Sequence, residues 1–207
     1  MSQLSDSWNA FSPEIASQYL KTYGHPSVSS KDLLLDVVRQ LTKQIKRPRV
    51  IDLGCGNGQL GEYFFEKGFD CNYTGVDFSD VLLAAGSQAL PQADFVKDDV
   101  GSLKGVIGSF DVALYSHVIE ILAAPEESLA AAKRIATKVV VRFFEPPEFE
   151  IDSVELKWME VGSEKPVPYL RRKMSRDYYR LILARIGCKS VDIYRDTTKD
   201  QIHVLHF

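Results

Sequence analysis

The chain has 207 residues, of which 45% are hydrophobic and 26% are charged, and its net charge is −3. This length suits one globular domain with a small appendage. We find no apolar run of 18 residues and no basic stretch followed by an apolar core at the N-terminus, so we expect neither a membrane span nor a secretory signal. The mildly acidic balance argues against a partner held by phosphate contacts. We therefore expect a cytoplasmic protein without a nucleic-acid partner.

The three cysteines give no sign of a metal site or a disulfide framework. Cys55, Cys71 and Cys188 are odd in number and far apart, and no C-x-x-C pair occurs. Structural zinc sites and disulfide scaffolds both need closer or paired spacings. We expect reduced thiols and no bound metal.

Residues 1–47 predict a helical appendage. Ser12-Pro13-Glu14 is a typical helix start, because proline is favoured in the first turn. A second helix follows Ser29 or Ser30, and Pro48 ends it. Its apolar residues recur at helical spacing: Leu33, Leu34, Val37, Val38 and Leu41.

From residue 49 onwards, strand and helix patterns alternate. The predicted strands cover 49–53, 72–77, 93–97, 110–115 and 138–144. The predicted helices cover 59–67, 79–90 and 126–136, and 100–108 is either a weak helix or a loop because three glycines interrupt it. Alternation of this kind predicts a parallel sheet with helices on both faces.

The C-terminal third changes character. Residues 145–174 hold four prolines and little clear periodicity, which indicates an excursion from the core. A helix is expected at 175–187. Residues 189–195 and 201–207 then alternate apolar and polar side chains around a polar turn, which is typical of a β-hairpin.

The stretch Arg49–Gly61 predicts a strand, a glycine loop and the start of a helix. Two ligands compete for this pattern. Gly56, Gly58 and Gly61 fit the dinucleotide motif G-x-G-x-x-G, and Asp77 lies about 20 residues on, where a ribose-binding acid belongs. However, Asp52 faces the same loop, and a carboxylate there would repel a diphosphate and attract a cation.

The pattern Asp52-x-Gly54-x-Gly56-x-Gly58 resembles the first motif of the class I S-adenosylmethionine-dependent methyltransferases. The resemblance covers residues 49–207 and is most specific over 49–122. It implies an α/β fold, namely a Rossmann-like, doubly wound, mostly parallel seven-stranded sheet that ends in an antiparallel β-hairpin. The methyltransferase domain would occupy 48–207, with 145–174 as a substrate-side excursion and 1–47 as a helical lid.

The resemblance also implies roles for residues at consecutive strand ends. Asp52 would hold the methionine ammonium, and Asp77 would accept both ribose hydroxyls. Asp99 would take the adenine amino group, although Asp98 cannot be separated from it. The further cofactor-binding residues would be Gly54, Gly56, Phe78, Val100 and Ser116, with Tyr19 and Tyr23 from the lid.

The sequence defines the residues that would bind the methyl acceptor less clearly. His117 could accept a proton from a nucleophile, because the pKa of histidine lies near neutrality; a histidine bonded to backbone fits the same letters. Candidate substrate-binding residues lie outside the sheet, where arginines beside aromatic rings suit an anionic or planar ligand. These candidates are His25, Glu145, Trp158, Tyr169 and Arg171.

These features predict an S-adenosylmethionine-dependent methyltransferase that acts on an oxygen or nitrogen atom of a small molecule, as a monomer or homodimer. Two alternatives stay open. One is a methyltransferase-like protein that binds the cofactor and regulates another enzyme. The other is a nicotinamide oxidoreductase, against which Asp52 and the closing hairpin argue.

Overall fold

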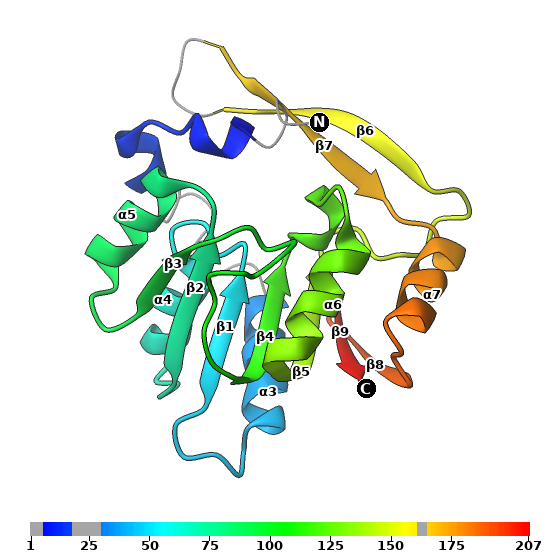
Figure 1. Cartoon of the computed structure of the whole chain (residues 1–207), viewed down its shortest axis with the longest axis horizontal. Helices are drawn as coiled ribbons and strands as arrows, with labels where there is room; N and C mark the ends of the chain where they lie inside the picture. Colours follow the sequence, from blue (N-terminus) through cyan, green and yellow to red (C-terminus); the bar gives the residue numbers. More distant parts are fainter. Residues whose placement is uncertain (1–5, 18–29, 161–164) are drawn as a thin grey trace.

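The computed structural model describes residues 6–17, 30–160 and 165–207, and its centre is a seven-stranded sheet in the order β3-β2-β1-β4-β5-β9-β8 (Figure 1). Neighbouring strands from β3 to β5 are parallel, and β9 runs antiparallel between β5 and β8. The strands are β1 (Arg49–Leu53), β2 (Asn72–Asp77), β3 (Asp94–Lys97), β4 (Phe110–Ser116), β5 (Ala136–Phe143), β8 (Ser190–Arg195) and β9 (Gln201–His206). The predicted fold class is confirmed.

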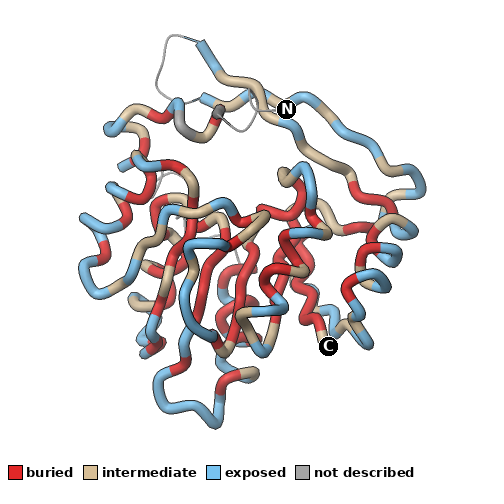
Figure 2. The backbone as a smooth tube through the Cα atoms, viewed as in Figure 1, coloured by how far each residue is buried: buried red, intermediate tan, exposed pale blue. Residues whose placement is uncertain are grey.

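Helices cover both faces of this sheet. The helices are α3 (Ser30–Leu41), α4 (Gln59–Glu66), α5 (Asp80–Ala89), α6 (Pro125–Ile135) and α7 (Arg176–Arg185). One core cluster joins the sheet to α3 and α4, and a second joins its other face to α6 and α7. The strands between them are buried over most of their length (Figure 2).

The period of two in β1 divides its side chains between these two clusters. Ile51 and Leu53 pack on the α6 face, and Val50 packs on the α3 face. Two of the helices have a serine N-cap. The side chain of Ser79 accepts a hydrogen bond from a backbone amide in the first turn of α5, and Ser175 does the same for α7. The helices and strands predicted from 49 to 97 and from 110 to 144, the helix near 175–187 and the closing hairpin are all present.

One part of the chain differs from the sequence reading and another settles an open alternative. Residues 100–108, predicted as a weak helix or a loop, form a loop. Residues 145–174 lie outside the main sheet as expected, but they contain an antiparallel hairpin, β6 (Ser153–Met159) with β7 (Val167–Lys173). Its alternation was missed because the apolar members of β6 face solvent: Val154, Leu156 and Trp158 are 48%, 53% and 62% exposed.

The N-terminal segment and this hairpin lie beyond the carboxyl ends of the parallel strands (Figure 1). The segment comprises η1 (Asp6–Asn9) and a helical stretch at 13–17. Phe11 and Ala16 pack against Leu82 of α5, and Met159 and Val167 of the hairpin complete that cluster. The predicted lid residues Tyr19, Tyr23 and His25 lie outside the described residues, so the lid remains a prediction.

The strand order bears on the choice between ligands. A nicotinamide-binding Rossmann sheet has the order 3-2-1-4-5-6, whereas here an antiparallel strand is inserted between β5 and β8.

No helix among the described residues is long and apolar enough to cross a membrane.

Candidate functional site

The loop between β1 and α4 brings bare backbone to the carboxyl edge of the sheet. Gly54, Gly56 and Gly58 have φ angles of 78°, 56° and 81°, which L side chains adopt only at a cost. A Cβ at Gly54 would lie 2.7 Å from a methyl carbon of Val118, so the loop is pressed against the segment after β4. A Cβ at Gly56 would meet no atom of the described chain within 4 Å. The backbone at Gly56 therefore borders space that no described residue fills.

Asp52 is a buried carboxylate with one unused oxygen. Its side chain is 2% exposed, and Oδ2 accepts a hydrogen bond of 2.6 Å from the hydroxyl of Tyr73. Oδ1 is buried and has no partner among the described residues. Burial raises the pKa of Asp52 to about 7, and the nearby charge of Asp77 adds to that rise. A cationic N–H donor would both satisfy Oδ1 and favour the ionised form, so this site fits an ammonium group.

Asp77 lies at the end of β2 and ties the glycine loop to α5. Oδ2 accepts a hydrogen bond of 2.9 Å from the amide of Gly56, and Oδ1 accepts one of 3.0 Å from the amide of Ser79. Burial raises the pKa of Asp77, and these backbone hydrogen bonds oppose the rise. Each carboxylate oxygen has a second lone pair, so hydroxyl donors can still bind there.

The residues expected around the adenine follow β2 and β3. Phe78 is half-buried directly after Asp77. Asp98 closes the next loop, since its oxygens accept hydrogen bonds from the amides of Asp99 and Gly105. Asp99 is exposed and accepts a hydrogen bond from the amide of Gly101, while Val100 is buried. Both oxygens of Asp98 are thus engaged within the loop, and Asp99 is the more accessible acid.

Ser116 and His117 lie at the end of β4, beside β5. Ser116 Oγ accepts a hydrogen bond of 3.0 Å from Arg142. His117 Nε2 lies 2.9 Å from Oδ2 of Asp200, and its ring meets Phe144 edge-on with centroids 5.5 Å apart. Burial lowers the pKa of His117, and the carboxylate of Asp200 opposes this. The imidazole is therefore neutral near pH 7.

A buried polar network holds this histidine, and sequence reasoning missed most of it. Asp200 Oδ2 also accepts hydrogen bonds from Ser30 Oγ at 2.7 Å and from Arg142 Nε at 3.1 Å. The side chains of Arg142 and Asp200 are only 3% and 6% exposed. The available signal was an arginine inside the strand Val-Val-Val-Arg-Phe, since a charge in a buried strand needs a partner.

A second cluster lies between the end of β5 and the hairpin. Glu120, in η2 (Ile119–Ile121), accepts hydrogen bonds from the amides of Phe144 and Glu145 through Oε1, and its buried Oε2 has no partner among the described residues. Burial raises the pKa of Glu120 to about 7. The guanidinium carbon of Arg171 lies 4.2 Å from the ring centroid of Phe144, and Nε of Arg171 lies 3.5 Å from Oε2 of Glu145. Glu145 and Arg171, both predicted as substrate-binding residues, are thus neighbours.

The inner face of the hairpin meets the N-terminal segment. Tyr169 meets Trp8 edge-on with centroids 5.8 Å apart, and the hydroxyl of Ser7 donates a hydrogen bond to the carbonyl of Pro168. Trp158 is paired with Pro168 and therefore points to the opposite face from Tyr169. At 62% exposure, Trp158 is separated from the other predicted acceptor residues.

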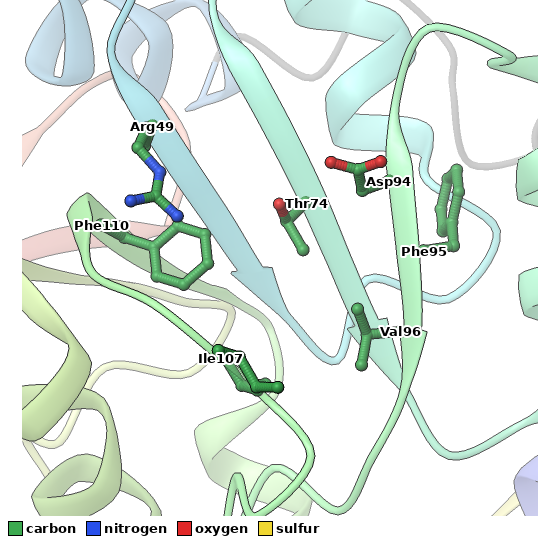
Figure 3. Close-up of a pocket in the computed structure, with 8 residues that line it drawn as sticks. Arg49, Thr74, Asp94, Phe95, Val96, Ile107 and Phe110 are labelled. Carbon is green, nitrogen blue, oxygen red and sulfur yellow. The ribbon is translucent and has the colours of Figure 1, made fainter.

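A surface pocket of ≈ 320 Å³ lies elsewhere, on the amino-terminal half of the sheet (Figure 3). Arg49, Asp94 and Phe110, which line it, are the first residues of β1, β3 and β4. The pocket exists where a loop replaces a crossover helix, and it contains none of the predicted site residues. No group of three or more metal-ligating side chains occurs in the described parts of the chain.

The sheet order, the closing hairpin and the carboxylates around the glycine loop define a class I S-adenosylmethionine-dependent methyltransferase fold. Residues 51–139 match the family model of a methyltransferase domain. This match covers less than half of the chain; it identifies residues 51–139 as a methyltransferase domain and agrees with the resemblance seen in the sequence. S-adenosylmethionine is the cofactor of this superfamily.

Similar proteins act on different acceptors. A trans-aconitate 2-methyltransferase from Rhizobium leguminosarum is 36% identical over 87 residues, which are 42% of this chain and 32% of that protein. An 18S rRNA (guanine-N7)-methyltransferase from Saccharomyces cerevisiae is 28% identical over 120 residues, which are 51% and 43% of the two chains. The chain thus spans less than half the length of these relatives.

A solved structure of similar fold covers nearly the whole chain. It is S-adenosylmethionine-bound CalS10, an amino pentose methyltransferase from Micromonospora echinaspora, with a TM-score of 0.66 and 15% identity over 95% of this chain and 98% of that one. At that identity the likeness establishes the fold, and it does not carry the acceptor across.

Proposed function

We propose that this protein transfers the methyl group of S-adenosylmethionine to an oxygen or nitrogen atom of a small-molecule acceptor. The observation that carries the proposal is the pair of buried carboxylates on either side of the glycine loop. Asp52 is the next-to-last residue of β1 and Asp77 is the last residue of the adjacent parallel strand β2, and Oδ1 of Asp52 has no donor among the described residues. A ligand with an ammonium at one end and two vicinal hydroxyls further along fits this arrangement, whereas a diphosphate does not.

The cofactor roles follow from position along the sheet edge. Asp52 would hold the ammonium directly or through water, and Asp77 would take the ribose hydroxyls. Gly54 and Gly56 would let the backbone approach the ligand. Phe78, Asp99 and Val100 would surround the adenine, and Ser116 would face the methionine end. Tyr19 and Tyr23 stay proposed lid contacts within 1–47.

The bound cofactor would supply a methyl group on a sulfonium, a good leaving group. The contribution of the chain is to hold donor and acceptor in line and to exclude water, the proximity effect. Two segments are suited to this, since the N-terminal segment and the hairpin contact each other beyond the carboxyl edge. A cover of this kind favours a small acceptor over a nucleic acid or a folded protein. His25, Glu145, Tyr169 and Arg171 are proposed acceptor contacts.

Binding of S-adenosylhomocysteine tests the cofactor half of the proposal. We expect calorimetry to detect binding by the unmodified protein and a loss of about tenfold to a hundredfold in Asp77→Asn, since charged hydrogen bonds contribute about 1.5–3 kcal/mol. Asp94→Ala is the matched control, because this exposed acid begins β3 at the opposite edge. Equal affinity in Asp77→Asn and the unmodified protein would remove the ribose role.

Transfer itself is tested with methyl-labelled S-adenosylmethionine and a panel of small acceptors that carry amine, hydroxyl or carboxylate groups. Label in a small-molecule product supports the proposal. Binding of the cofactor without transfer to any acceptor, together with capture of a partner enzyme whose rate changes, would favour the regulatory alternative instead.

A further inference from the structure

Five side chains from four elements converge at the end of β4. Ser30 comes from α3, Ser116 and His117 from the end of β4, Arg142 from β5, and Asp200 directly precedes β9. One oxygen, Oδ2 of Asp200, accepts hydrogen bonds from Ser30 and Arg142 and lies 2.9 Å from Nε2 of His117. The cluster thus centres on a single carboxylate.

The cluster is costly for the fold. Arg142 and Asp200 are almost fully buried, and a buried ion pair is often no more stabilising than apolar residues of the same size. His117 also has a φ of 60°, which a non-glycine residue adopts at a cost of about 1 kcal/mol. Residues held at such a cost are concentrated at functional sites.

The geometry fixes the tautomer of His117. Burial raises the pKa of Asp200, but hydrogen bonds from His117 and Ser30 and the charge of Arg142 outweigh it and hold that pKa at about 2. An ionised carboxylate can only accept, so Nε2 of His117 must carry the proton. In a neutral ring Nδ1 then has a free lone pair, and it has no partner among the described residues.

The position of the ring relates it to the cofactor loop. Val118, the next residue, packs against the Cα of Gly54. The charged groups around the ring are Asp200, Arg142 and Arg171, and the ring also contacts Phe144, whose other neighbours are Arg171 and Lys199. Both arginines disfavour a charged imidazole. The ring is therefore neutral before the reaction, and Nδ1 has a lone pair that can accept a proton.

Building on the proposed function, we infer that His117 is a general base held by Asp200 as a positioning residue, and that the acceptor therefore presents an O–H or N–H group. The acceptor heteroatom forms a bond to the methyl carbon while the carbon–sulfur bond breaks and its electron pair goes to sulfur. The acceptor proton passes to Nδ1 of His117 and then to solvent. A carboxylate acceptor has no proton to lose and would not need this arrangement.

The tautomer can be measured without cofactor or acceptor. We expect long-range ¹H–¹⁵N spectra of the unmodified protein near pH 7.5 to show His117 with Nε2 protonated and Nδ1 bare. In Asp200→Asn we expect a mixture of tautomers. The matched control is His206, whose Nε2 lies 2.8 Å from Asp192 at the exposed, opposite end of β9: Asp192→Asn should leave the tautomer of His117 unchanged.

Chemical rescue separates a base from a merely structural histidine. Glycine suits the φ of residue 117, so His117→Gly should fold and lose at least a hundredfold in transfer to an amine or hydroxyl probe. Added imidazole should restore part of that rate, and it should restore much less when Asp200→Asn is also present. Transfer to trans-aconitate, a carboxylate probe, should be insensitive to His117→Gly.

The outcomes also separate this inference from the proposed function. Failure of the unmodified protein to bind S-adenosylhomocysteine would sink the proposed function. Normal binding with a protonated Nδ1 on His117, or with unchanged amine or hydroxyl methylation in His117→Gly, overturns the inference alone. Asp192→Asn should leave transfer unchanged in every case.

Discussion

The polar side chains in the two halves of the carboxyl edge of the sheet have different kinds of hydrogen-bond partner. On the proposed cofactor side, the carboxyl ends of β1 and β2 carry Asp52 and Asp77, which accept hydrogen bonds from two backbone amides and one tyrosine. On the proposed acceptor side, the carboxyl ends of β4 and β5 carry Ser116 and Arg142, and the partners of Arg142 are distant in sequence: Ser30 lies 112 positions away and Asp200 lies 58 positions away. The first half is thus a local arrangement repeated from strand to strand, whereas the second exists only after the chain has closed.

The largest effect on the free energy of unfolding should come from breaking the buried Arg142–Asp200 ion pair on the acceptor side. Arg142→Met removes the partner of buried Asp200 but keeps much of the side-chain volume. We expect a loss of about 3–5 kcal/mol in the free energy of unfolding, because an uncompensated buried charge remains. Urea denaturation measures it. Arg142→Met combined with Asp200→Leu should recover most of the loss; a double variant as unstable as the single one would show that the charge is not the cause.

The cofactor side should respond to steric change instead. Gly54→Ala adds a Cβ at 2.7 Å from Val118 in backbone with φ of 78°, and we expect a loss of about 2–4 kcal/mol in unfolding free energy. Gly56→Ala has a similar φ, but no described atom lies within 4 Å of the added Cβ, so its loss should be about 1–2 kcal/mol. Equal losses at the two glycines would contradict the close contact between the loop and Val118.

A smaller, pH-dependent effect should distinguish Asp52. Its pKa is raised from 3.8 to about 7 in the folded protein, so between these values the folded state binds a proton that the unfolded state has released. The stability contributed by Asp52 is therefore present at low pH and is lost as the pH rises through 7. Relative to Asp52→Asn, the cofactor-free protein should lose about 2 kcal/mol between pH 5 and pH 7. A pH-independent difference between the two proteins would mean that Asp52 has a normal pKa.

The smallest effect is expected on the outer face of the hairpin. Leu156 is 53% exposed, so Leu156→Thr should change the unfolding free energy by less than about 0.5 kcal/mol. Tyr169→Ala, on the inner face beside Trp8, should cost more because it removes a ring contact. Thermal unfolding of both variants compares the two faces, and a larger loss in Leu156→Thr would show that they are reversed.

The sequence predicted the sheet well, and it gave a proposal for the cofactor-binding residues, because both depend on local patterns. Glycine spacing, an acid at each strand end and alternating periods are all visible within about ten residues. The hairpin at 153–173 was missed because its apolar side chains face outward, which reverses the usual reading of alternation. Asp200 was missed because its letters describe an ordinary polar turn, and only the closed sheet places it beside His117.

The hydrogen bond from the Asn57 side chain to the carbonyl of Ala16 joins the glycine loop to the N-terminal segment. Asn57 belongs to the glycine loop, and Ala16 is fully buried in the N-terminal segment. Any ligand that steadies the loop must therefore also favour the docked position of residues 6–17, by the same free energy that the docked segment returns to ligand affinity. Binding of the cofactor alone, without an acceptor, should then increase the protection of residues 6–17 from amide hydrogen exchange.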